Sequence, residues 1–317
     1  MRAVVLSETG GPEHLQMTDL PRPRPGEGQV LVRAHAVGVS YAETQIRAGT
    51  LPFPLALPEV IGAEAVGEVV EVGPGVDGKL LGTTLVGVTG GVGAYAEYVV
   101  LPAAMACPVP DGVSPVEAVA VAAPGSIALA LLHRARLDGT ETVLVEAGTS
   151  AVGGYLVQHA KEFGAGRVIA TAGSSAKRER AVTLGADIAI DHSTAGWPAE
   201  LPDVDVVFES IAGTTARQVL DRLTPGSGRM LYYGLLSGEP PAITAADLME
   251  RGVTLTGCSG PAWAAAAFGT HYPEMLARLA SGRSQAFIDR TLPLEEATQA
   301  HRLLESRAAT GRILLIP

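Results

Sequence analysis

The sequence predicts an α/β protein of two domains, the second built on a doubly wound parallel sheet. A length of 317 residues fits two domains, at about 150 residues each. With 47% hydrophobic and 18% charged residues, a mainly disordered chain is excluded. The first hundred residues indicate short strands separated by Gly and Pro. After residue 114, strand-like and helix-like segments alternate, which is typical of a parallel sheet covered by helices on both faces.

Short strands with alternating polarity are expected in the first hundred residues. Gln29–Ala36 alternates Val and Ala with other side chains, the period-2 pattern of a half-buried strand. Val66–Val72 and Tyr95–Val100 are two further strand candidates. The prolines of Pro21–Pro25 disfavour a helix at each preceding residue, so this segment is expected to be an extended connector. A ligand for a proline-recognition domain is the alternative.

The second half of the chain starts with a helix signal at Ser114-Pro115-Val116-Glu117, a capping box with Pro at the first helical position. Six buried strands are expected, at Thr142–Ala147, Arg167–Thr171, Ile188–Ile190, Val204–Glu209, Arg229–Tyr233 and Val253–Thr256. Helices are expected at 152–163, 176–184, 216–223, 272–279 and 297–304, and a last strand at Ile313–Ile316 is expected to rejoin the first domain. The predicted domains are therefore residues 1–116 with 259–317, and residues 117–258.

Charge and cysteine content exclude several classes of function. The net charge is −10 and no Lys/Arg block occurs, so no nucleic-acid partner is expected. Cys107 and Cys258 are too few for a disulfide framework or a four-thiolate zinc site. The apolar stretch Ala118–Leu132 is interpreted as too short for a bilayer and broken at Pro124–Gly125. No signal peptide is recognised, so we expect a cytoplasmic protein without a membrane partner.

The strongest chemical signal is a small-residue turn, Gly148-Thr149-Ser150-Ala151-Val152-Gly153, between a buried strand and an amphipathic helix. Small residues let backbone N–H groups approach a pyrophosphate, and the start of a helix adds unpaired donors and partial positive charge. In this context the turn predicts a dinucleotide site. A strand-to-helix turn without a ligand is the alternative.

The end of the second strand of the parallel sheet favours NADPH over NADH. An NAD site usually places an acid about 20 residues past the turn, and Ala172-Gly173-Ser174-Ser175 contains none. Ser174 can bind a 2′-phosphate and Lys177 can supply positive charge. The alternative is that Lys177 lies on a solvated helix face, as we expect for Arg178 and Arg180.

Several motifs together resemble the quinone oxidoreductase (zeta-crystallin-like) branch of the medium-chain dehydrogenases/reductases, in its zinc-free form. The resemblance covers nearly the whole chain. Its carriers are Gly38–Thr44, Ile46–Thr50, Gly62–Gly67, the strand and turn 143–153, Ala172–Ser174 with Lys177-Arg178, Leu184–Asp187, and Glu295–Ala297 through Gly311.

This resemblance implies a GroES-like substrate domain, made from both ends of the chain, beside a Rossmann domain with a six-stranded sheet. It implies a cytoplasmic homodimer that binds NADPH and reduces a small electrophilic substrate, a quinone or an α,β-unsaturated carbonyl. Ser150, Ala151 and Val152 with the two turn glycines are then expected to contact the pyrophosphate. His192 stands where the family often has a Tyr near the adenosine phosphate. Gly234 and Leu235, after the fifth strand, are expected under the nicotinamide.

Zinc-dependent relatives use a Cys near the Gly38 region and a His in a Gly-His-Glu motif. Here no Cys occurs in that region and the motif is Gly62-Ala63-Glu64, so we expect no metal ligands. Without a metal, hydrogen-bond donors must stabilise the oxyanion that forms during reduction. Ser40 and Tyr41 are the catalytic candidates, with Tyr41 or water as proton donor; a packing role for Tyr41 is the alternative.

Two departures from the family pattern leave other functions open. Ser40 stands where many relatives have Asn, and Ser150-Ala151 replaces Gly-Gly in the turn. One alternative is an NADPH-binding protein with little catalysis, acting as a sensor or structural protein. Another is an enoyl-thioester reductase of a biosynthetic pathway.

Overall fold

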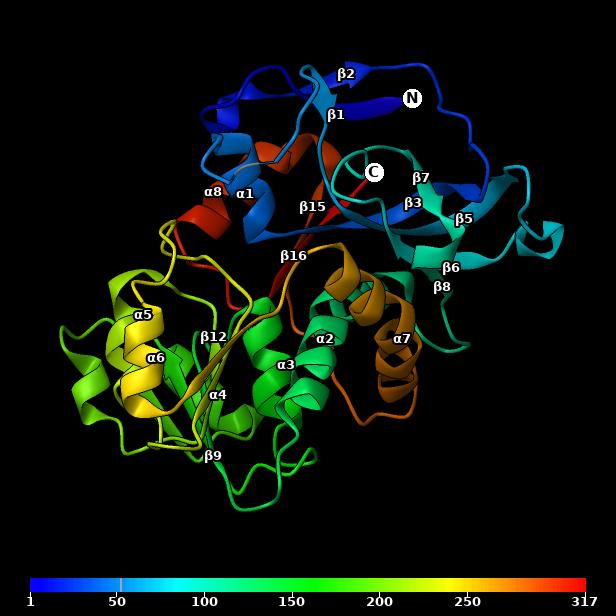
Figure 1. Cartoon of the computed structure of the whole chain (residues 1–317). Helices are drawn as coiled ribbons and strands as arrows, with labels where there is room; N and C mark the ends of the chain where they lie inside the picture. The colour runs from blue at the N-terminus through cyan, green and yellow to red at the C-terminus, as the bar shows by residue number, and fades with distance from the viewer. Residues whose placement is uncertain (52) are drawn as a thin grey trace. The chain divides into compact units, whose positions relative to one another are not determined.

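The computed structural model describes residues 1–51 and 53–317 and divides into two compact units (Figure 1). The first unit contains Met1–Ser126 and Phe268–Pro317, and the second contains Ile127–Ala267. Both unit boundaries lie inside long helices, α2 (Pro115–Ala135) and α7 (Pro261–Ala280). They therefore come later in the chain than the boundaries predicted from the sequence.

The first unit contains two sheets and is built from both ends of the chain. One sheet has the order β2-β1-β4, and the other has the order β15-β16-β3-β5-β6-β8 with β7 paired to β3. The strands are β1 (Arg2–Leu6), β2 (Leu15–Asp19), β3 (Gln29–Val39), β4 (Glu59–Val60), β5 (Glu64–Val72), β6 (Thr84–Val88), β7 (Tyr98–Pro102), β8 (Ala106–Pro108), β15 (Ile288–Pro293) and β16 (Arg312–Ile316). The other helices of this unit are α1 (Tyr41–Ala48) and α8 (Ala297–Glu305). The strand predicted at Ile313–Ile316 is present, and it pairs with β3 of the first unit.

Strand β3 is more deeply buried than its alternating pattern predicted. Val30, Leu31 and Val32 are all fully buried, although a half-buried strand should bury only every second residue. Strand β3 pairs with β5, β7 and β16, so it is an inner strand of this sheet. The predicted alternation is otherwise present, with Val32, Ala34 and Ala36 buried and Arg33 exposed, so only Leu31 departs from it.

Helix α2 continues through Pro124, which was expected to break it. Two local bonds accommodate the proline: the N–H of Ala123 donates to the Glu64 carboxyl at 2.8 Å, and the Ser126 hydroxyl donates to the Ala122 carbonyl at 2.6 Å. At 21 residues the helix is long and apolar enough to cross a membrane, contrary to our expectation from length. However, 72% of its most apolar window is buried within the protein, as in a core helix.

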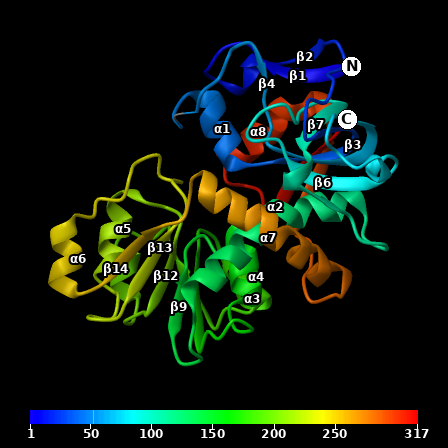
Figure 2. The same ribbon diagram turned by 45° about the vertical axis from the view of Figure 1, so that its right-hand side comes forward.

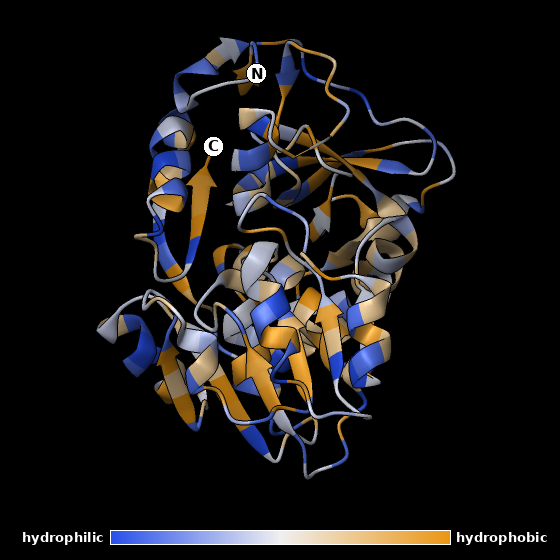
Figure 3. Ribbon diagram, turned by 60° about the vertical axis from the view of Figure 1, so that its left-hand side comes forward, coloured by the Kyte–Doolittle hydropathy of each residue, from blue (hydrophilic) through white to orange (hydrophobic). Residues whose placement is uncertain are grey.

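The second unit is the predicted doubly wound α/β domain. Its six parallel strands have the order β11-β10-β9-β12-β13-β14, which is the Rossmann order. Figure 2 labels four of them, β9, β12, β13 and β14. The strands, mostly orange by hydropathy in Figure 3, are β9 (Thr142–Val145), β10 (Arg167–Ala172), β11 (Ile188–Asp191), β12 (Val206–Glu209), β13 (Arg229–Tyr232) and β14 (Thr254–Gly257). The helices are α3 (Ala151–His159), α4 (Ser175–Leu184), α5 (Gly213–Leu220) and α6 (Ala245–Arg251). The sequence patterns predicted all of these except α6.

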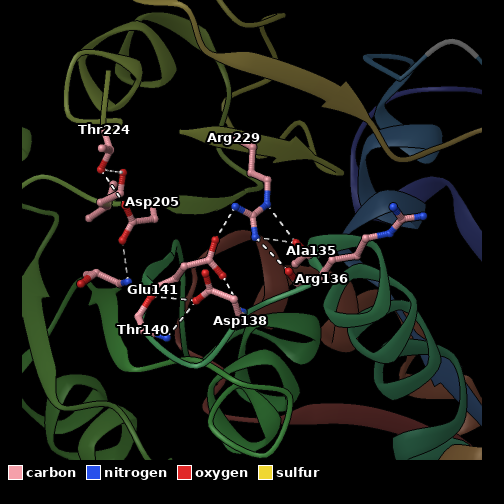
Figure 4. Close-up of polar contacts among 10 residues, drawn as sticks. Ala135, Arg136, Asp138, Thr140, Glu141, Asp205, Thr224 and Arg229 are labelled. Atoms are coloured by element: carbon pink, nitrogen blue, oxygen red, sulfur yellow. Dashed lines mark hydrogen bonds and ion pairs between the residues drawn. The ribbon is translucent and has the colours of Figure 1, made fainter. Parts of the chain in front are cut away.

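A polar network joins the amino ends of strands β9, β12 and β13 (Figure 4). Arg229 pairs with Glu141 at 2.5 Å and donates to the Ala135 carbonyl at 2.6 Å. Asp205 accepts from the Thr142 N–H at 2.8 Å and from a threonine hydroxyl at 2.7 Å. We call this set the amino-end network. It ties three strands to the end of helix α2.

Candidate active site

The predicted phosphate-binding turn lies at the carboxyl end of β9 and leads into helix α3. The Ser150 hydroxyl caps this helix by accepting the Gly153 N–H at 3.1 Å. Within residues 1–51 and 53–317, no hydrogen bond satisfies the N–H groups of Ala151 and Val152. Two unpaired donors at a helix N-terminus are the groups that bind a phosphate.

Both turn glycines are required by close packing. A Cβ on Gly153 would lie 2.3 Å from the Ala147 carbonyl oxygen, and one on Gly148 would lie 2.7 Å from the Ala170 Cβ. Ala147 itself has φ +47°, so the backbone enters the turn in the left-handed region. The turn therefore packs against strand β10, and the start of helix α3 packs against the turn, too closely for larger residues.

Thr171, which sequence reasoning missed, connects the turn to His192. Its hydroxyl accepts the Ala147 N–H at 3.0 Å and lies 3.1 Å from Nδ1 of His192. Its carbonyl accepts the Gly148 N–H at 2.9 Å. The structure thus brings His192, at the end of β11, together with the turn through one buried threonine.

Ser174 and Lys177 lie at the start of helix α4, after β10. The Ser174 hydroxyl caps α4 by accepting the Lys177 N–H at 3.4 Å. Arg178 was expected on a solvated helix face, but its guanidinium pairs with the Asp191 carboxylate. Parallel pairing of β10 with β11 places Asp191 opposite Ala172. An acid therefore stands beside the end of β10 after all, with its charge paired to Arg178.

Gly234 and Leu235 follow strand β13, at the same edge of the sheet. A Cβ on Gly234 would lie 2.8 Å from the carbonyl oxygen of Ser210, so the two segments are in close contact. The Leu236 N–H donates to that same carbonyl at 3.0 Å. This contact fixes the 233–236 segment against the end of β12.

Ser40 and Tyr41, the catalytic candidates, belong to the first unit. Ser40 is the N-cap of α1, and its hydroxyl accepts the Glu43 N–H at 3.4 Å, which leaves its own hydrogen able to donate. Tyr41 is the first residue of α1 and is half-buried. In the described part of the chain its hydroxyl has no hydrogen-bond partner. Both residues can therefore offer an O–H group.

Glu43 holds the start of α1 in place and was also missed. Its buried carboxyl accepts from the Ser40 N–H at 2.7 Å, the Ala63 N–H at 2.8 Å and the Tyr95 hydroxyl at 2.8 Å. Burial raises the pKa of Glu43 against the opposing effect of these bonds. The Tyr95 hydroxyl also lies 3.1 Å from Nε2 of His301. Burial, with the Arg47 charge as a second cause, lowers the pKa of His301 to about 3, so this imidazole is neutral at physiological pH.

Where zinc-dependent relatives have a His, this chain has Ala63, and the following acid is fully engaged. The Glu64 carboxylate pairs with Arg312 at 2.7 Å and accepts from the Tyr272 hydroxyl at 3.1 Å. Both of its oxygens are therefore bound within the protein. Neither residue is arranged as a metal ligand.

Comparison with known proteins assigns the chain to a family. A family model described as "Alcohol dehydrogenase GroES-like domain" matches residues 26–111, and one described as "Zinc-binding dehydrogenase" matches residues 151–281. The quinone oxidoreductase of Pseudomonas aeruginosa is 32% identical over 318 residues, 97% of each chain. The chain belongs to the quinone oxidoreductase family.

Other members of the quinone oxidoreductase family extend this picture. The 2-haloacrylate reductase of a Burkholderia species is 31% identical over 99% of this chain and 98% of its own. The structure of Escherichia coli quinone oxidoreductase complexed with NADPH has a TM-score of 0.91 and 30% identity, with all of both chains covered. The family, the GroES-like domain and the Rossmann-like domain predicted from the sequence are thus confirmed.

Proposed function

We propose that this protein is an NADPH-dependent oxidoreductase that reduces quinones or α,β-unsaturated carbonyls without zinc. The observation that carries the proposal is the turn between β9 and α3, with two unpaired N–H groups at the start of a helix. Relatives named quinone oxidoreductase and 2-haloacrylate reductase support this substrate class, since both names describe reduction of electron-poor unsaturated molecules.

The residues of the second unit fit a phosphorylated dinucleotide. The Ala151 and Val152 N–H groups would hold the pyrophosphate, and Ser174, Lys177 and His192 would face the adenosine phosphate. Gly234 and Leu235 would support the nicotinamide. NADPH supplies a hydride when it is bound. The crystallised complex of the Escherichia coli relative with NADPH supports the choice of cofactor.

Ser40 and Tyr41 are proposed as donors to the substrate oxygen. Reduction of a quinone or an enone by hydride places negative charge on that oxygen, and a hydroxyl donor lowers the free energy of this state. Ser40 remains able to donate because its helix-capping bond uses its oxygen as acceptor. Tyr41 would stabilise the charge or deliver the proton.

A mechanism without zinc is proposed on ligand grounds. Ala63 offers no ligand atom, and Glu64 is held by Arg312. We further propose a small-molecule substrate, a homodimer and a cytoplasmic location; sedimentation of the purified protein tests the oligomeric state.

Loss of reduced-nicotinamide absorbance in the presence of a quinone, an enone or an aldehyde tests the activity. We expect NADPH oxidation with the quinone or the enone. Ser40→Ala should lower kcat by about a hundredfold, as loss of an oxyanion donor does, with NADPH affinity unchanged. Tyr41→Phe keeps the ring, so a lower kcat assigns a role to the hydroxyl and an unchanged kcat assigns a packing role. Tight NADPH binding without oxidation by any of the substrates would refute the reductase proposal in favour of a binding protein.

A further inference from the structure

Two glutamates lie side by side at the carboxyl end of the parallel sheet. Neither of them has a role in the proposed cofactor site or in a motif of the family. Glu209 ends β12 and Glu146 directly follows β9. The strands pair in parallel with Phe208 opposite Val145, so the next residues along, the two glutamates, are opposite each other. Both side chains are fully buried.

Among the described residues, three of the four carboxyl oxygens of this pair lack a hydrogen-bond donor. In the described part of the chain, both carboxyl oxygens of Glu146 and Oε2 of Glu209 have no hydrogen-bond partner by distance and angle. The Ser210 N–H is the one donor that lowers the pKa of Glu146, and burial outweighs it. Two adjacent ionised carboxylates without a cation would repel each other strongly in a buried site. A hydrogen bond between two carboxyl groups requires one of them to be protonated.

We propose that Glu146 and Glu209 share one proton at neutral pH, and that this bond holds the loops on which the nicotinamide end of the cofactor rests. Burial raises the pKa of Glu146 well above its usual value, and the charge of Glu209 and its hydrogen bond to Glu146 raise it further. The titratable groups that face the pair are Tyr232 and Tyr233, whose pKa values burial also raises. These phenols stay neutral and bring no positive charge to the site.

The pair is coupled to the predicted nicotinamide loop through short contacts. Oε1 of Glu209 accepts the N–H groups of Ile211 at 2.6 Å and Ala212 at 2.7 Å. Ala212 has φ +67°, a strained conformation for a residue with a side chain, so these bonds are needed to hold it. The Ile211 carbonyl accepts from the Ser237 N–H at 2.8 Å, and Gly234 packs on Ser210. Repulsion that moved Glu209 would therefore move the 233–237 segment.

Unfolding at several pH values tests the shared proton without any cofactor. Because the pKa of Glu146 is raised in the folded state, its contribution to stability is fully present below the unfolded pKa and is lost as the pH rises towards the folded pKa. Glu146→Gln keeps the size and a hydrogen-bond donor but has no proton to lose. Over pH 5 to 9, the folding constant of the wild type relative to Glu146→Gln should fall, by up to about tenfold per pH unit. If the folding constants of the wild type and Glu146→Gln changed with pH in the same way, the proposal would be overturned.

The chain offers a convenient signal and a matched control for this measurement. Its two tryptophans, Trp197 and Trp263, both lie in the second unit, so their fluorescence follows unfolding of the unit that holds the pair. Glu141→Gln is the control variant. Glu141 lies at the other end of the same sheet and, unlike Glu146 and Glu209, pairs with a cation, Arg229. The stability of Glu141→Gln should differ from that of the wild type by a constant amount over this pH range. Should Glu146→Gln not fold, Glu209→Gln serves instead, since its amide oxygen can still accept from Ile211 and Ala212.

NADPH fluorescence titration tests the link to the cofactor loop, and this second test rests on the proposed function. Between pH 6.5 and pH 9 the affinity of the wild type for NADPH should fall several-fold more than the affinity of Glu146→Gln. Equal losses in both would refute the positioning role. If no variant binds NADPH at any pH, the proposed function fails, whereas the unfolding result on the shared proton still stands or falls by itself.

Discussion

The two ends of the parallel sheet differ in how their charges are satisfied. At the amino end, the guanidinium of Arg229 and the carboxylates of Glu141 and Asp205 all have partners of opposite polarity (Figure 4). At the carboxyl end, two buried glutamates face each other, and helix α3 presents unpaired N–H groups. The amino end contributes to stability, whereas the carboxyl end holds groups that have no hydrogen-bond partner among the described residues. Binding sites of parallel α/β sheets lie at that end.

The largest effect is expected from Gly153→Ala at the carboxyl end. The new Cβ would lie 2.3 Å from the Ala147 carbonyl, so the turn must open and the N–H donors of α3 must move. We expect about a thousandfold weaker NADPH binding, or ~4 kcal/mol, measured by fluorescence titration. Gly269→Ala is the control, because a Cβ there meets no atom within 4 Å. Wild-type affinity in Gly153→Ala would contradict our placement of the pyrophosphate.

Arg229→Ala, at the amino end, should lower the stability of the protein and leave its affinity for NADPH unchanged. It removes the ion pair with Glu141 and the bonds to the Ala135 carbonyl, and it leaves a largely buried carboxylate unpaired. The free energy of unfolding should fall by about 3 kcal/mol, while NADPH affinity at a temperature where the protein is folded should not change. Urea unfolding followed by tryptophan fluorescence measures the first quantity. A loss of affinity without a loss of stability would remove the distinction between the two ends.

A smaller and more selective effect is expected at the start of helix α4. Lys177→Ala should weaken NADPH binding by about tenfold, near 1.4 kcal/mol, and leave NADH binding unchanged, because only NADPH carries the 2′-phosphate. Lys161→Ala is the matched control, since that ammonium group pairs with Asp187 at 2.5 Å. Equal weakening of NADPH and NADH binding would show that Lys177 does not bind the 2′-phosphate.

The sequence predicted the sheet well because each of its strands carries a local signal. A continuous apolar run at the first strand, the alternation of strand-like and helix-like segments after it, and the small-residue turn predicted the doubly wound sheet and the turn. Helix α6 was missed although Thr244 and Asp247 form a capping box at its start. That box is followed by a short helix of seven residues without a buried face, so no apolar stripe indicated it.

What the sequence could not predict depends on which strands are neighbours. Glu146 and Glu209 are far apart in the chain and meet only because β9 pairs with β12. Asp191 reaches the end of β10 through the neighbouring strand β11, so a search along β10 alone found no acid. The continuity of α2 through Pro124 likewise depends on Glu64, a residue of strand β5. Local patterns define elements, whereas these contacts need the register of the sheet.

The pairing of β16 with β3 has a consequence for the order of events during synthesis. Strand β3 is made early, but its partners β16 and, beyond it, β15 come from residues 288–316, after the whole second unit. Domains fold as units while the chain emerges from the ribosome. The second unit is continuous in the chain and can therefore complete its sheet before β16 is made, while one side of β3 is still unpaired. A ribosome stalled before residue 312 would display a complete second unit joined to an incomplete first unit.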